Sequence, residues 1–150
     1  MKRVLSLVLV ALTLFALVGC SAVNTHMSWT YNVETGDNVK IKLTTNDGYT
    51  ISSELPFSVS QNGTVISQGT FIKGEFCEQY RTAANTQEGA KMLEEGEIDG
   101  HKYFVWSFDN KEWNYCIELA GGKTGILLGN ETSQASAQEV FNRLKITIEN

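Results

Sequence analysis

The sequence predicts an α+β domain, in which a twisted antiparallel sheet forms a hairpin meander and helices pack on it. The first observation is a regular series of turn signals, and the second is a β-rich run on each side of every turn. The third is the short spacing between runs, because parallel strands would need long helical crossovers for which there is no room. These features favour one antiparallel domain.

Five turn signals divide the chain, since Asn-Gly and Asp-Gly steps supply the positive φ that two-residue hairpin turns require. They lie at residues 46–48, 62–63, 99–100, 109–110 and 121–122. The predicted strands between and around them are 38–45, 49–53, 56–61, 64–72, 91–98, 102–108, 113–119 and 123–128. No internal repeat interrupts this order.

Two of these runs indicate how the sheet is covered. In 102–108 apolar side chains occur at both odd and even positions, so we expect this strand to be covered on both faces. In 113–119 the odd positions are apolar, whereas the even positions are Asn114, Cys116 and Glu118. We expect one buried face and one wetter face there, with Cys116 on the wetter side.

Two segments break the β pattern with helical spacing. Residues 75–86 predict one short helix, and a second helix should begin at Ser133 or Ser136 and run to Leu144. Ser136 has the spacing of a capping box with the acidic residue three positions later. The second helix carries an apolar stripe that can lie on the sheet, and a last strand is expected at 145–148.

The first nineteen residues have the pattern of a signal peptide. Lys2 and Arg3 precede an apolar run at 4–18, which is shorter than the roughly 20 apolar residues that cross a bilayer. Alternative interpretations are an ordinary secretory signal with a cysteine near its cleavage site by chance, and an uncleaved membrane anchor.

The end of that run, Leu17-Val18-Gly19-Cys20, resembles the lipobox of bacterial lipoproteins. In that family diacylglycerol is attached to the cysteine and a peptidase cuts before it. The resemblance implies that residues 1–19 are a signal peptide, 20–28 a lipidated tether and 29–150 a single domain. It also implies an exported protein held by lipid on Cys20 at the outer face of a bacterial membrane, either the cell surface or the periplasmic face.

The charge of the remaining chain restricts its partners. Removal of residues 1–19 takes two of the twelve basic side chains and none of the seventeen acidic ones, which leaves a formal balance of −7. An acidic domain repels phosphate backbones, so nucleic acid is not an expected partner. We expect an envelope protein or a glycan instead.

Two cysteines, Cys77 and Cys116, remain after Cys20 is assigned to the lipid. Export would place them in an oxidising setting, where they can form a disulfide that closes a loop of about 40 residues and contributes roughly 3–4 kcal/mol. The alternative is two buried free thiols. His26 and His101 are far apart and no close Cys or His pair exists, so neither a metal nor another cofactor is expected.

A further resemblance concerns the domain itself. Residues 47–49 followed by 55–59, the aromatic hairpin at 103–119, and the tail at 132–137 and 140–146 resemble PsbP-like domains. The resemblance covers most of residues 29–149, and its motifs are mostly core and cap positions. It implies a non-enzymatic role as an accessory subunit or binding adaptor, and it defines no ligand residues. Fold similarity is in any case a weak argument for function.

Few residues suggest chemistry. The segment 94–99 contains four carboxylates. A pair of them could act in acid–base catalysis, but we expect the segment to be a solvent-facing strand end and turn. His101 follows the Asp99-Gly100 turn and is expected to be a solvated loop residue. The segment 121–124 is similar to the end of a P-loop. A P-loop connects a strand to a helix, whereas this segment links two predicted strands, so we do not expect a phosphate-binding loop here.

Aromatic side chains around the 109–110 turn are the candidate binding surface, namely Tyr103, Trp106, Trp113 and Tyr115. An exposed aromatic patch would suit a sugar, a peptide or a protein, although such a stripe more often belongs to a core. The first functional hypothesis is therefore a non-catalytic, lipid-anchored binding or accessory module. The second is a surface hydrolase that uses the 94–99 cluster or His101, and the third is a structural envelope protein.

Overall fold

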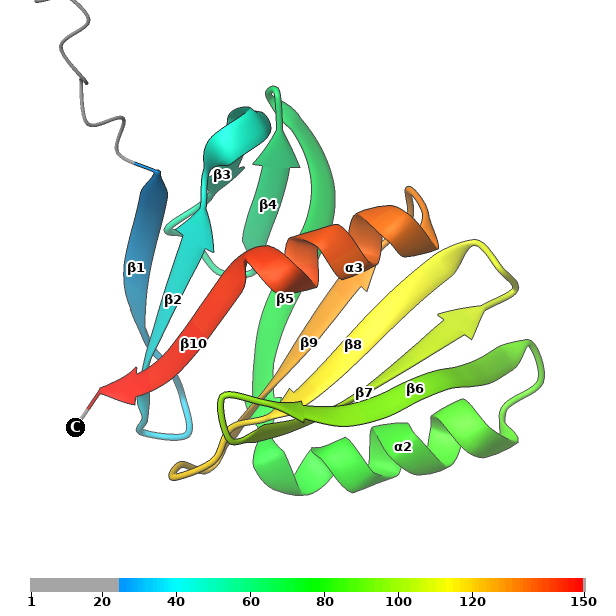
Figure 1. The fold of residues 1–150 in the computed structure, drawn as a ribbon. Helices are drawn as coiled ribbons and strands as arrows, with labels where there is room; N and C mark the ends of the chain where they lie inside the picture. The colour runs from blue at the N-terminus through cyan, green and yellow to red at the C-terminus, as the bar shows by residue number, and fades with distance from the viewer. Residues whose placement is uncertain (1–24, 150) are drawn as a thin grey trace, which may run out of the picture.

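The computed structural model describes residues 25–149, which form two antiparallel sheets with helices on both faces of the larger one (Figure 1). The strands are β1 (His26–Asn32), β2 (Asn38–Thr44), β3 (Tyr49–Ile51), β4 (Phe57–Gln61), β5 (Thr64–Lys73), β6 (Ala90–Ile98), β7 (His101–Phe108), β8 (Glu112–Glu118), β9 (Thr124–Asn130) and β10 (Leu144–Glu149). The helices are η1 (Asn46–Gly48), η2 (Gly74–Phe76), α2 (Cys77–Thr86) and α3 (Gln134–Arg143). The predicted antiparallel α+β class is confirmed.

The strands divide into a three-stranded sheet, in the order β1-β2-β10, and a seven-stranded sheet, in the order β3-β4-β5-β9-β8-β7-β6. The prediction of a single meander was therefore incomplete. Strands β6 to β9 do form a meander, but α2 first carries the chain from β5 to the far edge, so that β9 returns to pair with β5.

Four of the five predicted turns are hairpins, and the turn at 46–48 is not. That turn forms η1 and passes the chain from β2 in one sheet to β3 in the other. Asp47 and Gly48 both have positive φ, as the sequence suggested, yet the following strand pairs with β4 and not with β2. Positive φ marks a reversal of the chain, whereas strand pairing depends on where the apolar faces can be buried.

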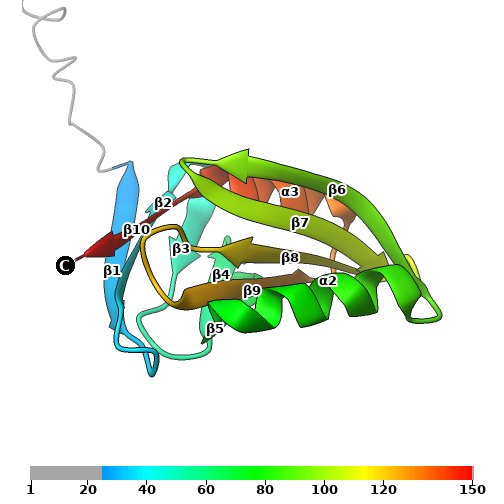
Figure 2. The same cartoon turned by 90° about the horizontal axis from the view of Figure 1, so that it is seen from below.

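The larger sheet lies between two layers. Figure 2 shows α2 along one face, while α3 and the three-stranded sheet lie on the other side. The main core fills the space between the two sheets, and the central strand β2 contributes Val39, Ile41 and Leu43, all fully buried. Side chains also join the sheets, because the indole of Trp29 donates to the carbonyl of Ile51 at 3.0 Å.

The predicted faces of β7 are confirmed, but the prediction for β8 was wrong. Both faces of β7 are covered, with Phe104 packed under α2 and Val105 in the main core. Cys116 was expected on a wetter face of β8, and it is fully buried. It lies under α2 with Cys77, Ala84 and Phe104. The helix therefore excludes water from a face of β8 that is polar in the sequence pattern of that strand alone.

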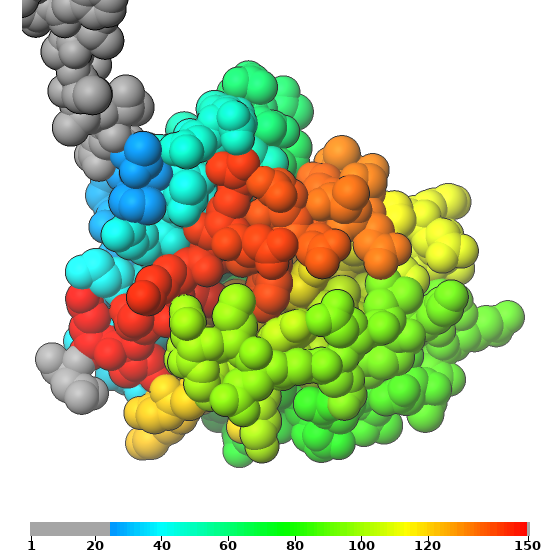
Figure 3. Space-filling view, viewed as in Figure 1, coloured from blue at the N-terminus to red at the C-terminus, as the bar shows by residue number. Residues whose placement is uncertain are grey.

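Both predicted helices are present. The first is η2 followed directly by α2, and the second is α3, which is capped by Ser133. The hydroxyl of Ser133 accepts a hydrogen bond from the backbone N–H of Ser136 at 3.0 Å. In Figure 3 α3 and β10 run across the surface between β2 and β6.

The domain begins earlier than the sequence suggested. Residues 26–28, expected in the tether, form the start of β1, where His26 is opposite Thr44 on β2. Only Tyr31 is buried along β1, so the strand carries almost none of the apolar alternation that would announce it. The proposed signal peptide, Cys20 and most of the tether lie outside the described residues. Within 25–149 no helix is long and apolar enough to cross a membrane.

Candidate functional site

A groove lies at the end of the domain where the turn between β1 and β2 meets β5, η2 and the turn between β8 and β9. It consists of two adjoining pockets of about 560 and 500 Å³, and both are lined by Glu34, Thr35 and Lys73. We call it the end groove. The elements are held together by backbone contact, since the N–H of Gly74 donates to the carbonyl of Lys123 at 2.7 Å.

One half of the end groove is apolar and exposed. Leu55 in the β3–β4 loop is 52% exposed and Phe76 in η2 is 38% exposed, and both line the larger pocket. The ammonium of Lys73 lies 5.9 Å from the centre of the Phe76 ring. Most large apolar side chains of this domain are buried, so two exposed ones in the same groove indicate a surface that can bind an apolar group.

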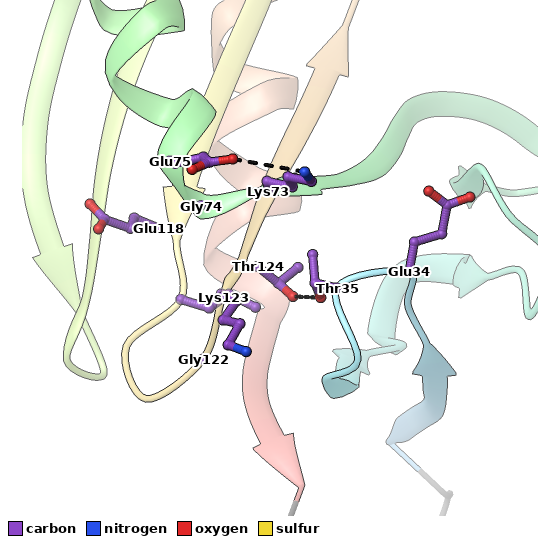
Figure 4. A pocket seen from close by; sticks show the side chains of 10 residues that line it. Glu34, Thr35, Lys73, Gly74, Glu75, Glu118, Gly122, Lys123 and Thr124 are labelled. Atoms are coloured by element: carbon purple, nitrogen blue, oxygen red, sulfur yellow. Dashed lines mark hydrogen bonds and ion pairs between the residues drawn. The ribbon is translucent and has the colours of Figure 1, made fainter.

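The other half carries charges of both signs. Figure 4 shows Glu34 and Glu118 on opposite sides of this pocket, with Lys73 and Glu75 between them in an ion pair of 3.9 Å. Lys123 supplies a second cation. These side chains come from both sheets and from η2, and all five are exposed, so they can rearrange around a ligand at little cost.

Next to this charged half, a set of hydrogen bonds holds the two turns in place. The carboxylate of Asp37 accepts hydrogen bonds from the Thr124 hydroxyl and the Lys123 backbone N–H, each at 2.7 Å. The hydroxyls of Thr35 and Thr124 are also hydrogen-bonded, and Thr124 is buried. The hydrogen bond from Thr124, followed by that from Lys123, lowers the pKa of Asp37 below its usual value. The two turns that form the groove are thus tied to one another.

His101 does not lie in a solvated loop, contrary to the sequence-based expectation. It is the first residue of β7 and is buried. Its Nδ1 accepts from the N–H of Ala120 at 3.0 Å, and its Nε2 lies 3.0 Å from the carbonyl of Ile146. Since Nδ1 is the acceptor, Nε2 carries the proton and donates to Ile146. Both ring nitrogens are used within the fold, which leaves neither free to act as a base.

Two carboxylates of segment 94–99, those of Glu94 and Glu95, lie on opposite faces of the sheet. Glu94 accepts a hydrogen bond from the Tyr103 hydroxyl at 2.6 Å, and this bond raises the pKa of Tyr103. Glu95 forms an ion pair with Arg81 of α2, on the opposite face of the sheet. Acid–base catalysis by two carboxylates requires both to flank the same scissile bond, whereas Glu94 and Glu95 lie on opposite faces of the sheet.

The four aromatic residues of the proposed binding surface do not form one patch. Tyr103 and Tyr115 lie on the α3 side, where their rings are 4.8 and 4.4 Å from that of Phe141, and Tyr115 is buried. Trp106 lies on the α2 side, stacked on Phe104 at 5.4 Å. Trp113 is partly buried against the main core. These residues are mainly core and helix contacts, which was the alternative interpretation of the stripe.

The two cysteines of the domain meet under α2. Cys77 is the first residue of the helix and Cys116 lies in the middle of β8, and both belong to one small buried cluster. Both are buried free thiols in the structure. The hydrogen bond from Cys116 lowers the pKa of Cys77, whereas the same bond and burial raise the pKa of Cys116.

Comparison with protein-family models, with curated proteins and with solved structures finds no match to this chain. Within residues 25–149 no three His, Cys, Asp or Glu side chains come together as a metal site. The end groove was not found from the sequence, because its lining residues come from five separate segments. The one local signal was Phe76, an apolar residue beside Glu75 and Lys73.

Proposed function

We propose that this chain is a membrane-anchored, exported lipoprotein whose domain is a non-catalytic binding module, and that the end groove binds a short peptide segment of a neighbouring envelope protein. The observation that carries the proposal is the groove itself, where exposed apolar side chains adjoin charges of both signs. A peptide offers the matching chemistry, namely an apolar side chain beside polar backbone and charged groups.

The position of the groove supports this role. The start of β1 and the β1–β2 turn lie at opposite ends of the three-stranded sheet (Figure 1). Seven strand residues at about 3.3 Å each separate them by roughly 20 Å. With lipid on Cys20, the chain would enter at the membrane-proximal end of the domain and the groove would face away from the bilayer, towards other envelope proteins.

The environment of the potential catalytic groups supports a binding role over the hydrolase alternative. His101 uses both nitrogens in internal hydrogen bonds, and the adjacent carboxylates of Glu94 and Glu95 face different sides of the sheet. The accessory role implied by the resemblance to PsbP-like domains agrees with a binding module, and that family assignment belongs to the same proposal.

Photo-crosslinking in native membranes tests the groove. Phe76 and Tyr80 have almost equal exposure, 38% and 36%, but only Phe76 lines the groove. p-Benzoylphenylalanine in place of Phe76 should give a discrete polypeptide adduct, whereas the same probe in place of Tyr80 should not. The adduct should disappear with Leu55→Asp and persist with Val65→Asp, a position of the same 52% exposure outside the end groove.

The contrary results are equally clear. Equal crosslinking from both positions, or an adduct that survives Leu55→Asp, would show that the groove is not the binding site. A ligand of another class, such as a glycan, would give no polypeptide adduct at all and would overturn the peptide assignment. The anchor is tested separately: Cys20→Ser should release the protein from membranes, and unchanged retention would refute lipidation at that residue.

A further inference from the structure

Two cysteines that are far apart in the sequence are brought into contact beside the end groove. Cys77 and Cys116 are separated by 39 positions, yet both lie in one buried cluster between α2 and β8. Cys77 is 5% exposed and Cys116 is fully buried. The apolar residues packed around them include Ala84 and Phe104, and the guanidinium of Arg81 lies over the Phe104 ring at 4.7 Å.

We propose that Cys77 and Cys116 form an intramolecular disulfide that fixes the η2 wall of the end groove. A disulfide needs side chains that point at one another across a short distance. Cys77 and Cys116 belong to neighbouring elements, α2 and β8, and lie in one buried cluster between them.

A glycine on the neighbouring strand makes room for the sulfur of Cys77. Gly125 on β9 pairs with Glu118 of β8, and a Cβ atom at Gly125 would lie 2.7 Å from Sγ of Cys77. That distance is too short for a carbon and a sulfur. The absence of a side chain at Gly125 therefore lets Cys77 reach down onto the sheet towards Cys116.

The surroundings of the two cysteines also indicate that Cys77 reacts first with the disulfide donor. Cys77 opens α2, where the helix dipole favours a thiolate, and Arg81 follows one turn later. Its thiolate attacks the disulfide of a disulfide-donating oxidoreductase, which forms a mixed disulfide and releases one donor thiolate. Cys116 then loses its proton and displaces the second donor sulfur. The protein loses two protons and two electrons, and the donor leaves as a dithiol.

The bond would act on the groove because the groove residues are adjacent in the chain. Gly74, Glu75 and Phe76 directly precede Cys77, and Glu118 follows Cys116 by two positions. A link between the two cysteines would fix η2 against β8, and so hold Phe76 in place. This consequence for the groove rests on the proposed peptide binding, whereas the disulfide itself requires only the export that the same proposal includes.

Peptide mapping under non-reducing conditions tests the bond in the protein collected from native membranes. Trypsin releases 74–81 and 112–123, each with a single cysteine, so the bond would appear as one linked peptide pair. After alkylation without reductant we expect the linked pair, which is lighter by two hydrogens than its two parts. We expect both cysteines to be alkylated only after reduction. Alkylation of both without reductant overturns the proposal, whatever the groove binds.

Stability provides an independent measurement. Reduction should lower the melting temperature by roughly 10 °C, as expected for a closed loop of about 40 residues in a domain of this size. The same reductant should leave the melting temperature of the variant C77A/C116A unchanged, which controls for effects of the reductant elsewhere. A wild-type melting temperature that does not respond to reduction contradicts a stabilising disulfide.

The effect on the groove has its own readout. Crosslinking from position 76 should decrease several-fold when the protein is reduced, and it should be equally weak in C77A/C116A with or without reductant. If the linked peptides are found but crosslinking does not change on reduction, the disulfide stands and its action on the groove is overturned. If no variant or condition gives crosslinking, the proposed function fails while the disulfide remains.

Discussion

The hydroxyl of Thr124 donates a hydrogen bond to the carboxylate of Asp37 at 2.7 Å, although the two residues are 87 positions apart. Asp37 lies in the turn after β1, and Thr124 opens β9. The same carboxylate oxygen accepts from the backbone N–H of Lys123. One acidic side chain therefore joins the two sheets at the end groove, and its replacement should affect both the stability and the binding surface.

Asp37→Asn should destabilise the domain by about 1–2 kcal/mol at neutral pH, because it removes the charge from these hydrogen bonds. The hydrogen bonds lower the pKa of Asp37 in the folded state. Their contribution is complete above the unfolded pKa of about 3.9 and is lost as the pH falls through the lower folded value. Urea unfolding from pH 7 to 2 should therefore show a shallower acid decline in Asp37→Asn than in the wild type. A decline in Asp37→Asn that runs parallel to that of the wild type would contradict the assignment.

His101→Ala should destabilise the domain by about 2–4 kcal/mol. The change leaves the N–H of Ala120 and the carbonyl of Ile146 without their hydrogen-bond partner and opens a cavity at a buried position. Chemical denaturation followed by circular dichroism measures the effect. His26→Ala, at the exposed start of β1, is the matched control and should change stability by less than about 0.5 kcal/mol. Equal effects of the two changes would show that the internal hydrogen bonds of His101 carry no particular weight.

Asn130→Ala should loosen the start of α3. The buried amide of Asn130 donates to the hydroxyls of Ser67 and Ser136 and accepts from the N–H groups of Thr132 and Ser133. Loss of these bonds should cost about 2–3 kcal/mol. Hydrogen exchange should locate the change at residues 132–137.

The variant Asn130→Asp separates the two halves of this network. It keeps the acceptor for Thr132 and Ser133 but removes the amide donor, so its stability should lie between those of the wild type and Asn130→Ala. A loss in Asn130→Asp as large as that in Asn130→Ala would place all the stabilisation in the bonds to Ser67 and Ser136.

Gly125→Ala should be strongly destabilising, by about 2–3 kcal/mol, since its Cβ would lie 2.7 Å from the sulfur of Cys77 and 3.1 Å from Ile72. Under reducing conditions, where no Cys77–Cys116 disulfide contributes, adding Cys77→Ala should recover part of this loss, because it removes the closest clashing atom. Gly129→Ala on the same strand is the control, since its Cβ would meet only the flexible Asn114 side chain at 3.2 Å. Additive effects of Gly125→Ala and Cys77→Ala in the double-mutant cycle would contradict the contact.

The sequence predicted local structure well because local signals control it. The hairpin turns at 62–63 and 99–100 contain residues that readily adopt positive φ, and both turns join antiparallel strands as expected. The capping of α3 by Ser133 was one of two alternatives that the residues left open. Strand β1 was missed, since a strand with a single buried side chain has no apolar period to detect.

The sequence by itself determined the antiparallel class, the positions of both helices and the apolar alternation of the strands, because turn chemistry and periodicity depend on neighbours in the chain. Only the tertiary structure decided which residues meet. It buried His101 and Cys116, divided the aromatic stripe between two faces, and joined Asp37 to Thr124. Burial depends on which element covers a face, and the end groove combines side chains from separate segments of both sheets. No local pattern records such long-range packing, so the candidate site came from the fold alone.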